Sequence, residues 1–269
     1  MQNIVLRFEN IRCRIQEACK RAKRASHEVQ LIAVSKNHTA EAVCFLAQHW
    51  LLKDKAIFGE SYVQEALEKI PTVAETLTNR QAFTEQALNT KLAWHFIGGI
   101  QSRKAKNLIG KFALIHSLDS FKVASILHKT WQDEVASKAR KLDEPAPQPQ
   151  QVLLQINIGE EKQKSGVLPK DLPLLCEQVQ ALSGLEVQGL MCLPPFFEKA
   201  EDSRPFFRQL RELRENLRKK TGLALPHLSM GMSMDFEVAI EEGATLVRVG
   251  TDIFGERTPK TKAIKNTTL

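Results

Sequence analysis

The sequence predicts an α/β protein that folds as a single-domain (β/α)8 barrel with an extra N-terminal helix. Eight short apolar runs follow one another along the 269 residues, and helix-like stretches separate them. Strands that are apolar on both faces and alternate with helices are typical of a parallel sheet. Eight such units in roughly 250 residues match the size of this barrel. A doubly wound open sheet is the competing architecture, but no G-x-G-x-x-G motif follows the first apolar run.

The first segment predicts the extra helix, because its apolar residues recur at helical spacing. That spacing places them on one face, which can cover a hydrophobic core. The residues are Ile4, Phe8, Ile11, Ile15, Ala18 and Ala22.

The eight expected strands follow this helix. They span Leu31–Ser35, Ala56–Gly59, Trp94–Gly98, Ala113–Ser117, Val152–Ile158, Glu186–Met191, His227–Met230 and Thr245–Val249. Helix-like stretches between them include Ala40–Leu52, Ser61–Ile70, Leu118–Trp131 and Ser203–Lys220. The alternation fits the TIM-barrel arrangement, in which a helix follows each strand.

Two segments are interpreted as surface insertions because they are longer or more polar than an ordinary connection. Residues 71–91 are polar, and residues 133–151 are charged and then rich in proline and glutamine, which predicts a flexible loop. The strand–helix alternation resumes after each segment, so neither marks a domain boundary. We therefore expect one domain over residues 1–258 and a flexible polar tail over residues 259–269.

The composition is that of a globular protein, and it indicates both the cellular location and the charge of the ligands. Hydrophobic residues make up 43% of the chain and the net charge is +7, which favours anionic ligands. No apolar stretch approaches the ~20 residues that a bilayer requires, and the N-terminus lacks the pattern of an export signal. The five cysteines include no C-x-x-C pair, which indicates reduced, buried thiols in a cytoplasmic protein.

Five arginines recur at helical spacing in the last third of the chain and could form a face that binds nucleic acid. Glu212 and Glu215 follow Arg208 and Arg211 by four residues, which is the spacing of ion pairs on an exposed helix. We therefore favour a solvated helix face and expect no nucleic-acid partner. The arginines are Arg204, Arg208, Arg211, Arg214 and Arg218.

Three segments at predicted strand ends carry groups that suit one ligand. Lys36 ends the first apolar run, Ser229–Ser233 follows the seventh, and Arg248–Thr251 closes the eighth. All strands of such a barrel end on one face, where active sites lie, and phosphate sites commonly use the loops after strands seven and eight. A primary amine, two small-residue anion sites and one fixed cation suit an aldehyde-bearing phosphate cofactor. Pyridoxal phosphate is the candidate.

Small and hydroxylated residues predict the phosphate site. Ser233 is expected to cap the helix that follows, whose first amides carry partial positive charge and lack intrahelical partners. Gly231 and Gly250 would let the backbone approach the ligand, while Ser229 and Thr251 add hydroxyl donors. A serine and a glycine at a helix start often form only a cap, but a second small-residue turn one strand later favours an anion site.

Lys36 and Arg248 are the predicted contacts to the aldehyde and to the ring. A lysine that forms a Schiff base must lose a proton near neutral pH, which partial burial and a nearby cation both favour. Arg248 lies in an apolar run, where an unpaired charge is costly. Its partner is therefore either a carboxylate or the ring nitrogen of the cofactor. An arginine beside that nitrogen does not help to protonate the ring, which favours holding the cofactor over carbanion chemistry.

His95, Asn157 and Met191 are further candidate contacts to the cofactor, because they lie in or at the ends of strands three, five and six. His95 is equally compatible with a buried core histidine. None of the seven histidines shows the spacing H-x-x-x-H or H-E-x-x-H, so no metal site is predicted.

These segments together resemble the pyridoxal phosphate homeostasis protein family, single-domain relatives of the N-terminal barrel of alanine racemase. The matching stretches occur in order between Leu31 and Arg257. They are A-V-S-K at 33–36, F-G-E-S-Y-V-Q-E at 58–65, W-H-F-I-G at 94–98, Q-S at 101–102, Q-I-N-I at 155–158, K-S-G at 164–166, G-L-M at 189–191, L-S-M-G-M-S at 228–233 and R-V-G at 248–250.

The resemblance implies that Lys36 carries the internal aldimine of pyridoxal 5'-phosphate. It also implies that Ser229, Gly250 and Thr251 help to bind the phosphate and that Arg248 faces the pyridine nitrogen. The implied role is to buffer the cofactor or deliver it to apo-enzymes, and to influence amino-acid and keto-acid balance, without established catalysis. One departure is the serine at position 61, where the family motif usually has asparagine.

The main alternative function is a pyridoxal phosphate-dependent amino-acid racemase. A two-base racemase needs an acid–base group on the ring face opposite the lysine, which in the resembling enzymes is a tyrosine from a second domain. This chain has one tyrosine, Tyr62, and only 20 residues after Val249, too few for that domain. A monomeric, non-catalytic carrier is therefore favoured, and a nucleic-acid binder that uses the basic charge is a third hypothesis.

Overall fold

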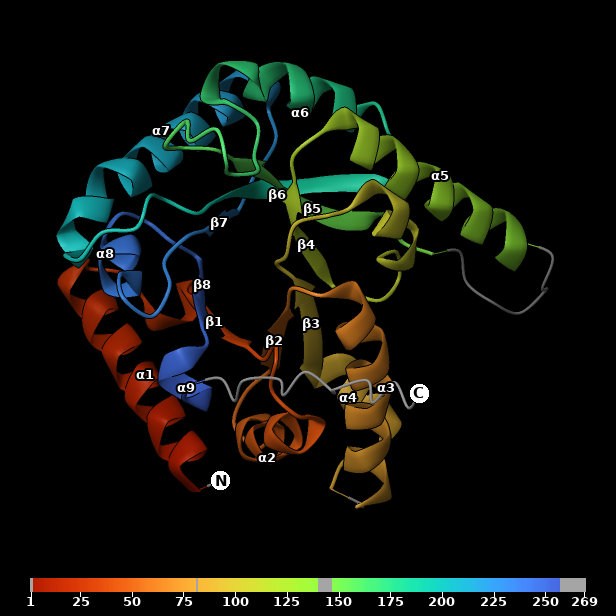
Figure 1. Cartoon of the computed structure of the whole chain (residues 1–269), viewed down its shortest axis with the longest axis vertical. Coiled ribbons are helices and arrows are strands. Elements are labelled where there is room, and N and C mark those ends of the chain that lie inside the picture. The colour runs from red at the N-terminus through yellow and green to blue at the C-terminus, as the bar shows by residue number, and fades with distance from the viewer. Residues whose placement is uncertain (1, 81, 140–146, 257–269) are drawn as a thin grey trace, which may run out of the picture.

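The computed structural model describes residues 2–80, 82–139 and 147–256, which form a closed barrel of eight parallel strands inside a layer of helices (Figure 1). The strands are β1 (Gln30–Val34), β2 (Ala56–Glu60), β3 (Leu92–Phe96), β4 (Leu114–Leu118), β5 (Gln150–Ile156), β6 (Leu185–Cys192), β7 (His227–Ser229) and β8 (Leu246–Val249). Each strand pairs with the next, and β8 closes on β1, with Ala33 opposite Val249. The predicted fold is confirmed, and each predicted strand end lies within two residues of the observed one.

Helices cover the outside of the barrel. They are α1 (Gln2–Arg21), α2 (Ala40–Leu51), α3 (Val63–Asn79), α4 (Glu85–Lys91), α5 (Phe121–Lys138), α6 (Leu172–Gln180), α7 (Arg204–Thr221), α8 (Phe236–Glu241) and α9 (Thr251–Phe254). Short 3-10 helices lie at η1 (Ser26–Glu28), η2 (Ser102–Asn107), η3 (Pro169–Asp171) and η4 (Ala200–Ser203).

The strands bury apolar side chains on both faces. In β1, Ile32 belongs to a cluster inside the barrel, while Leu31 and Ala33 pack in the larger cluster between strands and helices. This alternation follows from the two-residue period of a strand, and it explains why the strands read as continuous apolar runs. The interior cluster contains Ile32, Ile57, Ala93, Leu114, Leu153, Met191 and Leu246.

The predicted N-terminal helix is confirmed as α1, which packs against α8 and α9 (Figure 1). Its apolar stripe is buried at Phe8, Ile11, Ile15 and Ala18. The two helices beside it are short, with six residues in α8 and four in α9. The longer α1 therefore completes the outer layer where the last strand returns to the first.

The segment 71–91 is helical over most of its length, and the helix expected to end at Ile70 continues to Asn79 through Pro71. A proline inside a helix removes one backbone hydrogen bond. The apolar stripe continues past it, because Val73 and Leu77 are both fully buried. The prediction of an insertion from residue 71 onward rested on the polar character of the segment, and it missed this buried stripe.

The second expected insertion is also shorter than predicted. Helix α5 runs to Lys138 and β5 begins at Gln150, so only the stretch between them is a connection. Residues 147 and 148 are fixed to α5, because the indole of Trp131 donates to the carbonyls of Pro147 and Gln148, each at 3.1 Å. Residues 140–146 of the expected loop, and the expected tail at 259–269, lie outside the described residues.

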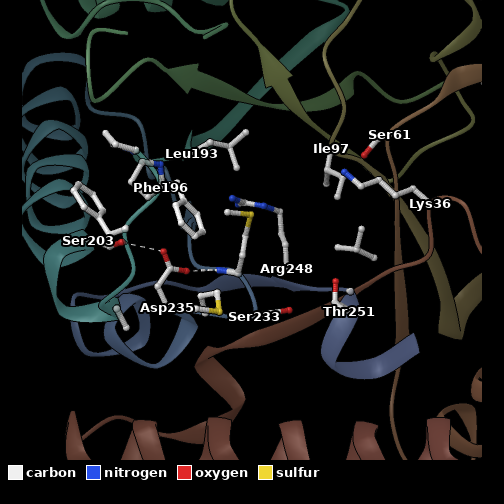
Figure 2. Close-up of a pocket in the computed structure, with 18 of the residues that line it drawn as sticks. Lys36, Ser61, Ile97, Leu193, Phe196, Ser203, Ser233, Asp235, Arg248 and Thr251 are labelled. Carbon is white, nitrogen blue, oxygen red and sulfur yellow. Dashed lines mark hydrogen bonds between the residues drawn. The ribbon is translucent and has the colours of Figure 1, made fainter. Parts of the chain in front are cut away.

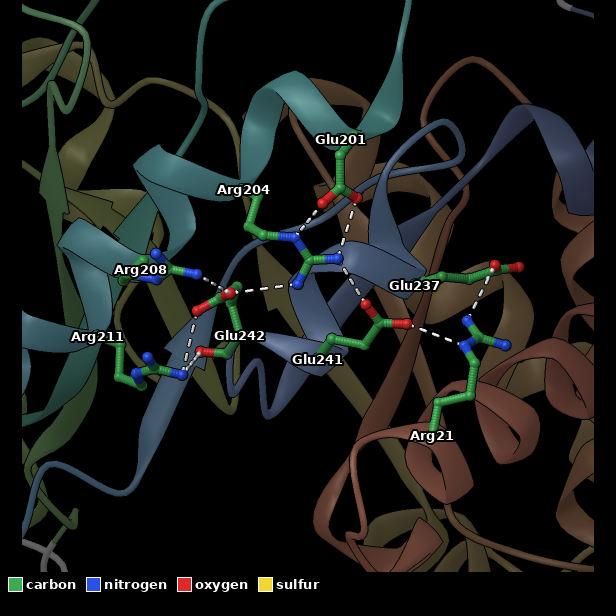
Figure 3. A network of polar contacts seen from close by, with 8 residues as sticks. All are labelled: Arg21, Glu201, Arg204, Arg208, Arg211, Glu237, Glu241 and Glu242. Atoms are coloured by element: carbon green, nitrogen blue, oxygen red, sulfur yellow. Dashed lines mark hydrogen bonds and ion pairs between the residues drawn. The ribbon is translucent and has the colours of Figure 1, made fainter.

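The arginine stripe of α7 is paired within the chain, in part by partners other than those predicted (Figure 3). Arg214 and Arg218 pair with Glu215 of the same helix, at 2.8 and 3.3 Å. Arg208 and Arg211 both pair with Glu242 after α8, at 3.1 and 3.2 Å, instead of with Glu212 and Glu215. Arg204 pairs with the same carboxylate at 3.2 Å. Glu241 accepts from Arg204 at 2.7 Å and from Arg21 of α1 at 2.9 Å. These ion pairs join α8 to both α7 and α1.

All five cysteines are free thiols. Cys13 is exposed, which corrects the expectation that each cysteine is buried, and the other four are buried. Across the described ranges, no helix has the length and apolar character needed to cross a bilayer.

Candidate functional site

A cavity of about 480 Å³ opens where β1, β6, β7 and β8 end (Figure 2). Its volume falls in the range of small-molecule sites, ~300–1,000 Å³. Half of the ten predicted contacts line it. They are Lys36, Ser233, Arg248, Gly250 and Thr251. Residues that are far apart in sequence therefore meet at the face of the barrel where its chemistry was expected.

Lys36 enters the cavity from the end of the first strand. Strand β1 ends at Val34, and the amide of Ser35 still donates to Gly59 of β2 at 3.0 Å. The side chain of Lys36 is half-buried and extends toward the cavity beside Ser61 and Ile97 (Figure 2). The serine at position 61 thus lines the same cavity as Lys36.

Arg248 enters the same cavity from β8 and is only 3% exposed. Its guanidinium donates to the hydroxyl of Ser229 and, at 3.0 Å, to the carbonyl of Cys192. Burial lowers the pKa of Arg248, yet a guanidinium remains a cation at neutral pH. The alternative of a structural ion pair is wrong, since no carboxylate pairs with Arg248 among the residues that the structure describes.

Two buried histidines continue the hydrogen bonds of Arg248 into the barrel. Nδ1 of His116 lies 2.8 Å from the hydroxyl of Ser229, and Nε2 of His116 lies 3.0 Å from Nδ1 of His95. Burial lowers the pKa of His95 to about 3 and the pKa of His116 well below its usual value. Both rings are therefore neutral at physiological pH.

A guanidinium only donates, so the Ser229 oxygen accepts from Arg248. The directions of the bonds from Ser229 to His116 and from His116 to His95 follow from the tautomer of His116. With the proton of His116 on Nε2, Ser229 donates to His116 and His116 donates to His95. Arg248 is thus oriented by neutral groups. This series of hydrogen bonds contains no acidic side chain that could pass a proton toward the cavity.

Ser229 and His95 consequently lie behind Arg248 and outside the lining of the cavity. The Ser229 hydroxyl was predicted to contact the phosphate, but it is fully buried and bonded to Arg248 and His116. His95 was equally compatible with a contact to the cofactor and with a buried core histidine, and the structure shows the buried core histidine. His116 was missed, because a histidine inside an apolar run gives no sign of its partners.

The loop between β7 and α8 is shaped by Asp235. One of its carboxylate oxygens accepts from the amide of Met232 at 2.7 Å, and the other accepts from the hydroxyl of Ser203 at 3.1 Å. Helix α8 begins at Phe236 with Asp235 at its N-cap position, so the prediction that Ser233 caps this helix is wrong. Ser233 instead lies in the preceding turn, where it lines the cavity with Thr251 (Figure 2).

Both glycines allow close packing of the chain, and Gly250 also lines the cavity. Gly231 has a φ of +88°, and a Cβ there would lie 2.6 Å from the Cβ of Ala239. It lets the loop turn tightly onto α8 and does not line the cavity. A Cβ on Gly250 would lie 3.3 Å from the carbonyl oxygen of Val34. Gly250 thus allows the last loop to lie against β1, close to Lys36.

Asn157 and Met191 are not brought to the cavity. The side chain of Asn157 donates to the carbonyl of Glu161 at 2.8 Å and accepts from the Glu161 amide at 3.1 Å. It therefore folds the loop after β5. Met191 is 1% exposed and fills the barrel interior. Both residues lie at strand ends as expected, but their side chains serve the scaffold.

Several lining residues were missed by sequence reasoning. The loop after β6 contributes an apolar wall, and its Leu-Pro-Pro-Phe-Phe run directly after a strand was an available signal. Lys164 of the preceding loop supports this wall by donating to the carbonyl of Pro194 at 2.8 Å. The apolar lining residues of the loop after β6 are Leu193, Pro194, Pro195, Phe196 and Phe197, and the loop after β7 adds Met232 and Met234.

Comparison with known proteins identifies the family of this chain. Residues 9–258 match the family described as alanine racemase, N-terminal domain. The pyridoxal phosphate homeostasis protein of Aquifex aeolicus is 42% identical over 255 residues, which cover 95% of this chain and 99% of that protein. This chain belongs to the pyridoxal phosphate homeostasis protein family. A family member from Bos taurus is 35% identical and covers 91% of this chain and 84% of its own.

Solved structures place the family in its fold. The structure of PipY from Synechococcus elongatus, with PLP bound, has a TM-score of 0.71 and 31% identity, and covers 94% of this chain and 100% of that chain. An alanine racemase from Clostridium difficile has a TM-score of 0.62 at 13% identity and covers 98% of this chain but 59% of that one. The second likeness shows the fold alone. The predicted family resemblance is confirmed.

Proposed function

We propose that this chain binds pyridoxal 5'-phosphate through Lys36 and takes part in cofactor homeostasis, by buffering the cofactor or delivering it to apo-enzymes. The observation that carries the proposal is the convergence of Lys36, Arg248, Ser233 and Thr251 on one cavity. The family to which the chain belongs supports the same conclusion. A monomer in the cytoplasm is part of the proposal.

The donor set of the cavity fits the cofactor group by group. Pyridoxal phosphate, when bound, supplies an aldehyde carbon that condenses with a primary amine and releases water. Lys36 offers that amine. Arg248 would face the ring nitrogen, while the Ser233 and Thr251 hydroxyls, with the amides where α9 begins, would hold the phosphate. Gly250 supports this arrangement by letting the α9 turn lie against β1.

The surroundings of Arg248 favour holding the cofactor over driving carbanion chemistry. A carboxylate beside the ring nitrogen would stabilise its protonated form, but Arg248 is a donor held by a serine hydroxyl and a backbone carbonyl. The nearest lining carboxylate, Asp235, has both oxygens bonded to the chain. A ring kept unprotonated withdraws electrons weakly. We therefore propose a non-catalytic carrier that serves amino-acid and keto-acid balance indirectly.

A racemase is the second candidate, and the position of the one tyrosine disfavours it. Tyr62 is 52% exposed and is absent from the lining of the cavity. The tyrosine is therefore not placed to supply the second acid–base group on the opposite ring face. Conversion of L-alanine to D-alanine by pure protein at ordinary enzyme rates would favour the racemase over the carrier.

The proposed link to Lys36 is tested by reduction and mass spectrometry. We expect purified protein with pyridoxal 5'-phosphate to absorb in the visible range, and borohydride to fix the cofactor on Lys36. The Lys36→Ala variant should lose this absorbance and remain folded. Lys164→Ala is the matched control, because Lys164 also lines the cavity and its loss should leave the adduct intact. Labelling of Lys164, or of no lysine, contradicts the proposal.

Delivery and passive storage are separated by a transfer experiment. Loaded protein is mixed with an apo-form of a pyridoxal phosphate enzyme in the presence of a scavenger that removes the free cofactor. Activation of the enzyme that outpaces release into solution indicates direct delivery. Activation that follows the rate of spontaneous release indicates storage.

A further inference from the structure

A buried cluster of charged side chains adjoins the backbone that carries Lys36. At its centre is Lys69 of α3, whose side chain is 5% exposed. Its ammonium group donates to Glu60 at 2.7 Å, to Glu65 at 2.7 Å and to the carbonyl of Ser35 at 2.8 Å. Glu60 ends β2 and is fully buried. All three donor positions of the ammonium are therefore used.

The same cluster bonds to both neighbours of Lys36. On one side, the hydroxyl of Ser35 donates to Glu60 at 2.7 Å. On the other side, the amide of Asn37 donates to Glu65 at 2.6 Å. Asn37 has a φ of +62°, a left-handed conformation that asparagine adopts more readily than most residues other than glycine. The turn that presents Lys36 is thus held at two points.

Stability alone is a poor explanation for this cluster. Burying ionised groups is costly, and well-packed apolar residues of similar size often stabilise a protein as much or more. In addition, Glu60 and Glu65 each have one buried carboxylate oxygen without a hydrogen-bond partner. What an ionic cluster adds over an apolar one is directional hydrogen bonds, and here these end on the residues before and after Lys36.

We propose that Glu60, Glu65 and Lys69 are positioning residues that fix the backbone on both sides of Lys36 and so aim its amine at the aldehyde. This inference rests on the proposed function. A lysine side chain has four rotatable bonds, so the place and direction of its backbone decide where the amine is found. A misplacement of about 1 Å at a reacting group can cost ~100-fold in rate.

The test compares covalent attachment with non-covalent binding in the full-length protein. Lys69→Met keeps most of the length of the side chain and removes its donors, and Glu65→Ala removes the acceptor of Asn37. Attachment is followed by the visible absorbance with pyridoxal 5'-phosphate and by borohydride trapping on Lys36. Pyridoxine 5'-phosphate, which lacks the aldehyde, measures binding alone. Glu68→Ala is the control, because Glu68 is exposed on the same helix.

We expect both variants to attach the cofactor at least ~10-fold more slowly than the unchanged protein and to bind pyridoxine 5'-phosphate with unchanged affinity. The control should match the unchanged protein in both measurements. Equal attachment rates in all proteins, or a parallel loss of attachment and of pyridoxine 5'-phosphate binding, would overturn the inference.

Two features keep the outcome decisive. Glu65 is partly exposed, with 16% of its side chain accessible, so Glu65→Ala tests the inference even where Lys69→Met fails to fold. Attachment in the unchanged protein tests the proposed function itself. If the unchanged protein does not attach the cofactor, cofactor binding through Lys36 is refuted. If the unchanged protein attaches it and Glu65→Ala attaches it at the normal rate, only the positioning role is refuted.

Discussion

Ser229 shows how the role of one residue depends on neighbours that the sequence does not reveal. Its hydroxyl lies between Arg248, 19 positions later, and His116, 113 positions earlier. A serine in a small-residue loop after strand seven suggested a phosphate contact. In the folded chain, the hydroxyl faces the barrel interior and orients Arg248. The phosphate contacts that remain open to a ligand are those of Ser233 and Thr251.

This difference predicts that substitution of Ser229 lowers stability, whereas substitution of Thr251 weakens ligand binding. Ser229→Ala leaves Nδ1 of His116 and one donor of Arg248 without a partner, so we expect it to lower the free energy of unfolding by about 1–3 kcal/mol. Thr251→Ala changes an exposed residue and should leave stability unchanged while weakening the binding of pyridoxine 5'-phosphate. Urea unfolding and ligand titration measure the two quantities. Weaker binding in Ser229→Ala without lost stability would restore Ser229 as a phosphate contact.

At the scale of elements, the loops that follow the strands are packed against one another before any ligand is present. The loop after β3 presses on the loop after β2, because a Cβ on Gly98 would lie 2.0 Å from the carbonyl oxygen of Ser61. On the other side of Lys36, the ring of His38 stacks on Phe254 of α9, with centroids 4.8 Å apart. The amine is therefore presented by a preformed set of loops.

Adjacent glycines after β3 provide a matched test of this packing. Gly98→Ala would place a methyl group against the backbone of Ser61, and we expect a loss of about 1–3 kcal/mol in the free energy of unfolding. Gly99→Ala meets no atom within 4 Å and should be tolerated. Thermal unfolding and cofactor attachment are measured for both. Equal behaviour of the two variants would show that the loops after β2 and β3 move apart easily.

At the scale of the whole molecule, the site exists only because the barrel closes. Lys36 follows the first strand and Thr251 follows the last, and the pairing of β1 with β8 brings them to one cavity. Helix α1 and the ion pairs of α8 hold that closure from outside (Figure 3). Order in the site is consequently tied to stability of the complete fold.

The buried histidine pair makes that stability depend on pH. In the unfolded chain, His95 titrates near its ordinary pKa of 6.5, whereas in the folded chain burial lowers this pKa to about 3. Above pH ~6.5 both states are neutral and the histidine has no effect. Below it, the unfolded chain binds a proton that the folded chain does not. The free energy of unfolding then falls by up to about 1.4 kcal/mol per pH unit for this residue.

We therefore expect the urea midpoint to decline between pH 7 and pH 5, and the decline to be shallower in His95→Gln. Burial raises the pKa of Glu60, which acts in the opposite sense because a folded state that binds more protons gains stability as the pH falls. The comparison between variants is thus more informative than the slope alone. His27→Gln, at an exposed position, is the control. An identical decline of the urea midpoint with pH in the unchanged protein and both variants would contradict the conclusion that burial lowers the pKa of His95.

The amino-acid sequence by itself determined the barrel, the N-terminal helix, the family and five of the residues that line the cavity. These follow from local patterns, namely apolar runs, helical spacing and short motifs at strand ends. Only the tertiary structure decided that Ser229 and His95 orient Arg248, that Met191 fills the interior and that Glu60, Glu65 and Lys69 surround the turn of Lys36. A strand end shows where a side chain begins, but its partners come from strands that meet only when the barrel closes.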